Sequence, residues 1–277
     1  MELKVITVYC ICDDLIKSKN IQDHPQSRMI LAEILTTGIV AALFYRGNVQ
    51  NARLYLLSAR YIPNMLSHSR INRKLLSVDP DLWQAILLLC SHLLINRKGH
   101  SREFIVDSFP MPACHPSRSW RCKLYEGKEY LGYCAAKKLH YFGIKIHVLI
   151  SSEGAIVEFL FTPASMGDIS GLKLMNLDLP EGSTLYGDRA YQSAQFETLL
   201  KDEADVHLVT QKRRNSKTPL KGPLAFLQKI YRRGIETTFS QITRLMGRFI
   251  SARSRKGFEL RVVWFLLAYS IEKTIKI

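Results

Sequence analysis

The chain has 277 residues, 47% of them hydrophobic, and its 39 Lys and Arg against 24 Asp and Glu give a formal net charge of +15. This apolar content suffices for a large core, and the length allows two domains. The charge favours a polyanionic partner, most often nucleic acid, over the alternative of an ordinary enzyme that happens to be basic. The most apolar windows, residues 29–45 and 262–269, are interrupted by Glu33 or too short to cross a bilayer, which excludes a membrane-spanning chain.

The N-terminus and the cysteines indicate where such a chain would work. No long apolar segment follows Met1, so we expect a soluble, cytoplasmic protein without a membrane partner. The six cysteines contain no Cys-x-x-Cys pair, and the cluster of Cys and His between residues 114 and 140 lacks zinc-site spacing. We therefore expect free thiols.

Residues 1–100 are predicted to be helical. Apolar residues recur at helical spacing near residues 15–21 and again over 30–43. Further helices are expected over residues 49–59, 67–76 and 82–95. A polar stretch containing Gly99, residues 96–103, is the best candidate for a boundary between an N-terminal region (1–100) and a second domain (101–277).

The short helix over 67–76 has a basic face formed by His68, Arg70, Arg73 and Lys74. A short basic helix after a turn suits a helix-turn-helix reader of DNA. The alternative is a solvated helix face with no ligand. The overall charge favours DNA contact by Arg70, Arg73 and Lys74.

The second domain alternates between strand and helix patterns. Residues 104–110 predict a buried strand that carries Asp107 near its end and is closed by Pro110. The remaining elements, in chain order, are a hairpin over 141–150 and 155–162, a strand over 184–188, a helix over 193–204, a strand over 206–210, a long helix over 224–246 and an apolar helix over 258–275 packed on the sheet. This order is that of a ribonuclease H-like α/β domain with a mixed five-stranded sheet and flanking helices.

Three carboxylates fall at corresponding places on these elements. Asp107 lies on the first strand, Asp188 at the end of the fourth, and Glu236 on the long helix. Three oxygen ligands on separate elements suit one or two hard cations. Taken singly, Asp188 could cap the turn that follows it, and Glu236 could pair with Arg232 on its own helix.

Two further basic segments flank the long helix and are candidate phosphate contacts. These residues are Lys212, Arg213 and Arg214 before the helix, and Arg253, Arg255 and Lys256 after it. Two polar side chains of the second domain have simpler interpretations. His147, on an alternating strand, is expected to be structural, and Asp168 is expected to cap a helix that starts near residue 169.

Five segments together resemble the DDE transposases of bacterial insertion sequences, and the insertion-sequence 982 family in particular. They are Asp107, residues 143–150, residues 162–169, residues 186–191, and Arg232 with Glu236, within a match over about residues 100–260. The resemblance implies a ribonuclease H-like core that uses Mg²⁺ or Mn²⁺, as two ions, to cut element ends and join them to target DNA. Asp107, Asp188 and Glu236 would be the catalytic metal ligands, and Arg232 would contact DNA or steady the glutamate.

The sequence therefore predicts a transposase that binds double-stranded DNA, at the element ends and at the target, and that associates with the nucleoid when bound. A homodimer on DNA is expected by analogy. Two alternatives remain open at this stage. One is a ribonuclease H-like nuclease or resolvase that cuts without joining, and the other is an inactive DNA-binding protein derived from a transposase.

Overall fold

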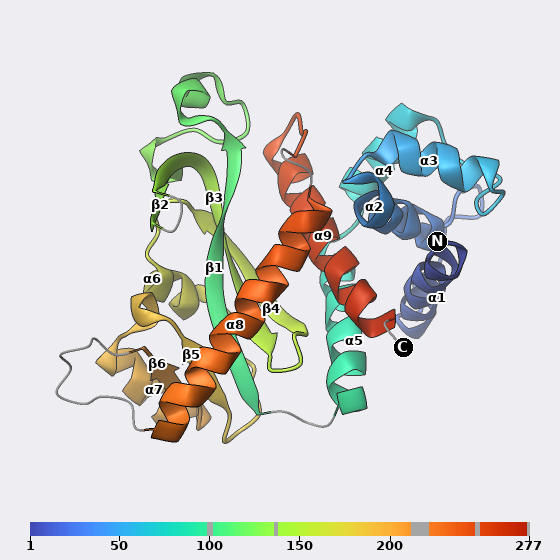
Figure 1. Ribbon diagram of the computed structural model, residues 1–277. Helices are drawn as coiled ribbons and strands as arrows, with labels where there is room; N and C mark the ends of the chain where they lie inside the picture. Colours follow the sequence, from blue (N-terminus) through green and yellow to red (C-terminus); the bar gives the residue numbers. More distant parts are fainter. Residues whose placement is uncertain (99–101, 136–137, 212–221, 247–249, 276–277) are drawn as a thin grey trace. The chain divides into compact units, whose positions relative to one another are not determined.

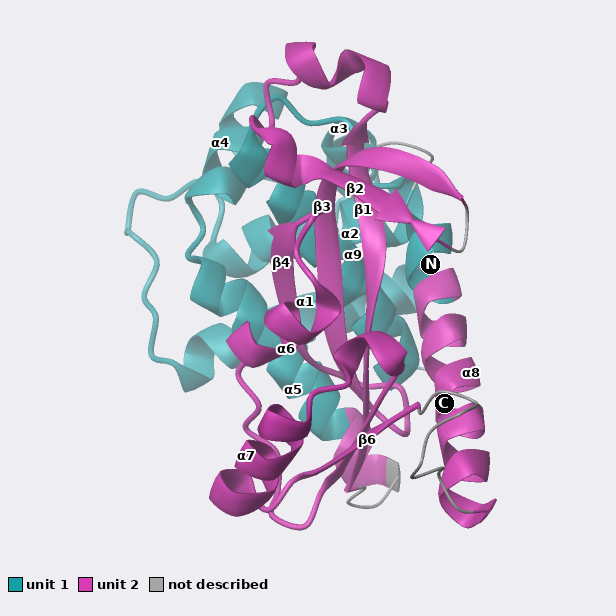
Figure 2. Cartoon of the chain, turned by 90° about the vertical axis from the view of Figure 1, so that its left-hand side faces the viewer, with its two compact units in different colours: residues 1–93, 241–277 teal, residues 94–240 magenta. Residues whose placement is uncertain are grey.

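The computed structural model describes residues 1–98, 102–135, 138–211, 222–246 and 250–275. The chain divides into two compact units, unit 1 with residues 1–93 and 241–277, and unit 2 with residues 94–240 (Figure 2). The end of unit 1's first segment lies near the expected boundary at residue 100. The sequence predicts residues 101–277 as one domain, whereas residues 241–277 belong to unit 1 in this division of the chain.

Unit 1 is built from helices around α2. Its helices are α1 (Glu2–Ser18), α2 (Leu31–Tyr45), α3 (Val49–Ser58), α4 (His68–Ser77), most of α5 (Pro80–Lys98), and α9 (Arg255–Ile275). Helix α2 is buried along most of its length and packs against α1, α3, α4 and α9. An all-round apolar helix is stable only when neighbouring helices cover every side. The helices that surround α2 confirm the predicted helical character of the N-terminal region.

The packing of α9 differs from the expectation that it covers the sheet. At Gly38 of α2 an added Cβ would lie 2.9 Å from Trp264 Cε2 of α9, so the missing side chain lets the helices approach closely. The Trp264 ring also lies 5.9 Å from the Trp83 ring of α5. The apolar faces of α9 are thus buried by other helices, which accounts for its place in unit 1.

Among the described residues, no single helix is long and apolar enough to cross a bilayer. The pair α4 and α5, which is bent by 78°, has the length and apolar composition of a membrane span when the two helices are taken together.

Unit 2 contains a mixed sheet, for which the described residues supply six strands. They are β1 (Glu103–Cys114), β2 (Leu131–Cys134), β3 (Leu139–Ser151), β4 (Ile156–Pro163), β5 (Thr184–Gly187) and β6 (His207–Thr210). The strand order is β2-β3-β1-β5-β6, with β4 also paired to β3. Strand β3 pairs antiparallel with β1, whereas β1–β5 and β5–β6 are parallel (Figure 1).

The sixth strand comes from a stretch without a strand pattern. Residues 112–133 contain two short 3₁₀ helices, η1 (Pro116–Arg121) and η2 (Lys128–Tyr130), before β2 pairs with the start of β3. This strand has four residues, Leu-Gly-Tyr-Cys, without a β-branched residue, and its pairing with β3 defines it.

Strand β1 is longer than the sequence predicted. It continues past Asp107 and Pro110 to Cys114, so the carboxylate lies mid-strand rather than near its end. Beyond Ile105, where the recorded pairing with β5 stops, β1 remains paired with β3. Proline cannot donate a ladder hydrogen bond, and an edge without a recorded partner is where a strand tolerates it.

Helices cover both faces of the sheet. Helices α6 (Asp168–Leu174) and α7 (Ala194–Ala204) enclose a core on one face that includes Phe104, Val106 and Leu149. On the other face α8 (Gly222–Leu245) crosses β1, and the rings of Phe109 and Phe239 lie 4.7 Å apart (Figure 1). Because side chains alternate along a strand, Asp107 shares the face of Phe109 and is directed to the α8 side.

Candidate active site

Two aspartates extend from neighbouring parallel strands on the α8 side of the sheet. The last β1–β5 pair is Ile105 with Tyr186, so Asp107 lies two residues further along β1 and Asp188 lies two residues further along the chain, just past the end of β5. Asp188 is the N-cap of the 3₁₀ helix η4 (Arg189–Tyr191), where its carboxylate accepts a 2.7 Å hydrogen bond from the Ala190 amide. The parallel pairing therefore brings together carboxylates that are 188 − 107 = 81 residues apart in the sequence.

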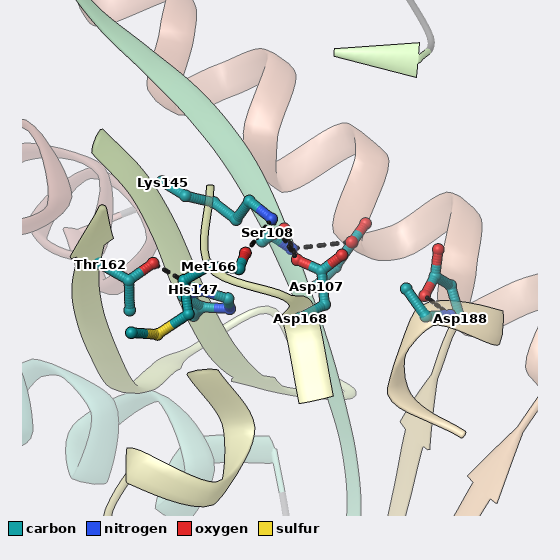
Figure 3. Close-up of polar contacts among 9 residues, drawn as sticks. Asp107, Ser108, Lys145, His147, Thr162, Met166, Asp168 and Asp188 are labelled. Carbon is teal, nitrogen blue, oxygen red and sulfur yellow. Dashed lines mark hydrogen bonds and ion pairs between the residues drawn. The ribbon is translucent and has the colours of Figure 1, made fainter. Parts of the chain in front are cut away.

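The Asp107 carboxylate is in a poorly compensated electrostatic environment. Burial, together with the negative charges of Asp188 and Asp168, raises its pKa to about 7. A 2.7 Å hydrogen bond from the Ser108 amide and the charge of Arg232 act in the opposite direction. Figure 3 shows Lys145 on one side of Asp107 and Asp188 on the other. The site therefore disfavours negative charge on Asp107 unless a cation binds there.

A polar cluster on the opposite face of the sheet supports the part of β1 that carries Asp107. Asp168 accepts a 2.7 Å hydrogen bond from Ser108 Oγ and forms a 3.1 Å ion pair with Lys145 Nζ (Figure 3). Lys145 Nζ also donates a 2.7 Å hydrogen bond to the Met166 carbonyl. The predicted capping role of Asp168 is wrong, because Gly167 is the N-cap of α6 and the Asp168 carboxylate is directed to the sheet.

Sequence reasoning assigned no role to Ser108 or Lys145. The signal was present in the alternation of residues 143–150, where Lys145 and His147 are the polar members of an otherwise apolar strand. His147 agrees with its structural interpretation. It is fully buried, lies 3.0 Å from Thr162 Oγ1 through Nε2, and packs so closely on Gly171 that an added Cβ would lie 2.3 Å from its ring. Burial lowers its pKa to about 4, so the ring is neutral at pH 7.

Helix α8 is fixed beside the two aspartates by contacts from its buried face. The Tyr231 ring lies 4.7 Å from that of Tyr186, and Gln228 Nε2 donates to the Gly187 carbonyl at 3.0 Å. Glu236 follows the buried Ile235 and is exposed at the edge of this face.

The Glu236 carboxylate is paired with an arginine of its own helix. Arg232 Nε donates to Glu236 Oε1 at 3.1 Å, and Arg232 Nη1 donates to Gln211 Oε1 at 3.2 Å. Within the described part of the chain, no three His, Cys, Asp or Glu residues are grouped so that they could hold a metal ion. The structure thus brings Asp107 and Asp188 together, but it does not gather all three predicted ligands.

Comparison with known protein families agrees with this arrangement. A family model described as "Transposase DDE domain" matches residues 98–271, which is 271 − 98 + 1 = 174 of the 277 residues. The chain belongs to this transposase family. Neither the curated proteins nor the solved structures include a match. Membership confirms the ribonuclease H-like fold class, because DDE transposase domains have that architecture.

Members of this transposase family generally use divalent metal ions, and the residues present fit such an ion in part. Asp107 and Asp188 offer the hard oxygen ligands that Mg²⁺ prefers, and a cation would offset the burial and the repulsion that raise the pKa of Asp107. Glu236, the third predicted ligand, is paired with Arg232 at 3.1 Å.

The predicted DNA contacts of the transposase lie on several elements. Arg70, Arg73 and Lys74 are exposed on α4, on the side away from the buried Ile71 and Leu75. Arg253, Arg255 and Lys256 are exposed at the start of α9, where Arg255 pairs with Glu259 at 2.8 Å. Arg232 is exposed on α8 in unit 2. Lys212, Arg213 and Arg214 lie outside the described residues.

The charge of Asp107 should cost the transposase stability in the absence of a cation. The pKa of this carboxyl is raised from 3.8 to about 7 on folding, so its destabilising effect is absent at low pH and grows as the pH rises through that window. At about 1.4 kcal/mol per unit the limit is about 4 kcal/mol, which the partial exposure of the residue reduces.

We expect Asp107→Asn to raise the melting temperature in chelator at pH 8, and to change it little near pH 4. The control is Asp202→Asn, at an exposed residue of α7, which should be neutral at both pH values. Thermal unfolding followed by circular dichroism makes this comparison. A gain that is equal at both pH values would contradict the electrostatic explanation.

Proposed function

We propose that this transposase binds the ends of its insertion sequence and catalyses metal-dependent cleavage of DNA strands followed by their transfer to a target. The observation that carries the proposal is the pair Asp107 and Asp188, presented by neighbouring parallel strands within a basic chain. The resemblance of five ordered segments to the insertion-sequence 982 family supports the same activity. Residues 1–100 would supply DNA binding and residues 101–277 the catalytic domain, and two copies of the chain would pair on the DNA.

In this proposal Asp107, Asp188 and Glu236 hold two Mg²⁺ or Mn²⁺ ions. The ions would supply charge stabilisation at the scissile phosphate and lower the pKa of an attacking water or 3′-hydroxyl. The protein's own residues would position the ligands. The Ser108 amide and hydroxyl connect Asp107 to Asp168, and Arg232 would orient the Glu236 carboxylate, with which it pairs on α8.

A joining assay tests the proposal directly. Purified protein is incubated with Mg²⁺, a DNA fragment that carries the ends of the element encoding it, and a circular target. We expect nicks at the element ends and covalent products that contain both fragment and target. Cutting without joined products would favour a nuclease or resolvase, and binding without either reaction would favour an inactive derivative.

A further inference from the structure

Two adjoining cavities in unit 1 are lined by residues of α4 and of the segment that leads into α9. Their volumes are about 640 and 420 Å³. His68, Ser251 and Arg261 line both, so these residues form a shared wall. His68 and Ser251 are exposed residues, which places this wall at the surface of the unit. The exposed basic residues Arg70, Arg73 and Lys74 of α4 do not line either cavity.

The charged residues in the described lining of the two cavities are arginines. Arg253 lines the larger cavity, Arg46 the smaller and Arg261 both, and no Asp or Glu occurs among the described residues of either lining. Within the described part of the chain Arg261 has no carboxylate partner. Burial lowers the pKa of its guanidinium, which nevertheless stays protonated at neutral pH. A partly buried cation without a counter-ion is unfavourable, so an anion in this space would stabilise the unit.

Hydrogen-bond donors at the cavities also favour an anionic ligand. Helix α4 begins at His68, and its N-cap Ser67 makes no side-chain capping bond, which leaves first-turn amides for another acceptor. Trp264, which lines the larger cavity, has a buried indole N–H without an acceptor among the described residues. Asn72 adds a side-chain amide to the same lining. Donors of this kind, combined with cations, select a ligand with several anionic oxygens.

We propose that this pair of cavities binds the phosphodiester backbone of nucleic acid, with Arg261 contacting a phosphate from their shared wall. Two adjoining spaces with cations in each suit successive phosphates of one strand better than a single small anion. The choice of DNA as the ligand rests on the proposed function, but the site itself rests on the lining of the cavities. It shares His68 with the basic face of α4 but includes none of Arg70, Arg73 and Lys74, and none of its lining residues belongs to the carboxylate pair of unit 2.

The first test removes the shared cation. Binding of the full chain to a fluorescein-labelled DNA duplex is measured by anisotropy over a range of salt concentrations. We expect Arg261→Gln to weaken binding about tenfold or more, since a charge-assisted contact is lost, and to reduce the log–log salt slope by about 0.9. Arg261→Lys should keep most of the slope but recover only part of the affinity, because an ammonium lacks the planar fork. Arg28→Gln, at an exposed residue of unit 1 outside both linings, is the matched control and should change both quantities less.

A second variant leaves Arg261 in place and adds a negative charge. Gly257 lines the larger cavity, and an added Cβ would lie 3.2 Å from Ser254 Oγ and 3.8 Å from Leu76 Cδ2, which a small shift of the hydroxyl accommodates. A glutamate at this position, three residues after the N-cap Ser254, also suits the start of α9. We expect Gly257→Glu to weaken duplex binding about tenfold relative to Gly257→Ala, with the fold of both checked by circular dichroism.

The outcomes separate this site from the activity of the enzyme. If a folded Arg261→Gln variant, or Gly257→Glu where the former does not fold, binds the duplex like its reference, the proposal is overturned. It is also overturned if inorganic pyrophosphate raises the melting temperature of the wild-type chain alone while both variants keep full affinity for DNA, since the site would then take a small anion. A wild-type chain that binds DNA but neither cuts nor joins it refutes the proposed function and leaves this test intact.

Discussion

Asp107→Asn, Asp188→Asn and Glu236→Gln should each lower cutting and strand transfer by about 10³-fold or more, because a metal centre contributes several kcal/mol to phosphoryl transfer. Each substitution keeps the shape of the side chain and removes one negative charge. Loss of that charge weakens capture of the cation. DNA affinity should stay the same or rise, since a negative charge near the phosphates has been removed.

The measurement compares strand transfer, gel-shift affinity and thermal melting for the three variants. The matched controls are Asp202→Asn and Glu203→Gln, which change exposed carboxylates of α7 and should leave all three quantities unchanged. A variant that keeps near wild-type transfer would remove that residue from the proposed ligand set. The Glu236→Gln result is the most informative, because this carboxylate is paired with Arg232 and the described residues contain no group of three metal ligands.

Removal of divalent cations should abolish cutting and joining, and return of Mg²⁺ or Mn²⁺ should restore both. Ca²⁺ should support binding with little cutting, because it favours longer bonds and more ligands than Mg²⁺. Mg²⁺ should also raise the melting temperature, since it relieves the repulsion on Asp107. At a concentration about a hundredfold above its Kd, this stabilisation is about 2.7 kcal/mol.

The thermal shift gives a reading that does not depend on turnover. Asp188→Asn should lose most of the Mg²⁺-induced rise in melting temperature, whereas Asp202→Asn should keep it in full. Full activity in excess chelator would rule out the metal-dependent mechanism. A rise that is equal in wild type and Asp188→Asn would instead place the cation at another site.

Local patterns in the sequence were sufficient for most elements of the fold, but not for β2. Alternation over 141–150 predicted β3, and helical periodicity predicted α7 and α8 to within a few residues. The bounds of β1 were less predictable. Proline at 110 indicates a strand end in a doubly paired strand, but here the recorded β5 pairing stops at Ile105 and the strand continues along β3.

The sequence by itself determined the fold class, the basic character of the chain, the assignment of Asp107 to a strand and that of Asp188 to a strand end, because these depend on composition and on periodicity over a few residues. Only the tertiary structure decided which distant groups meet. Strand register brings Asp107 to Asp188, and packing of α6 brings Asp168 to Ser108 and Lys145. Packing against α2 likewise places α9, with the partly buried Arg261, in unit 1. Such contacts depend on how complete elements pair and pack, and no local pattern in the chain encodes them.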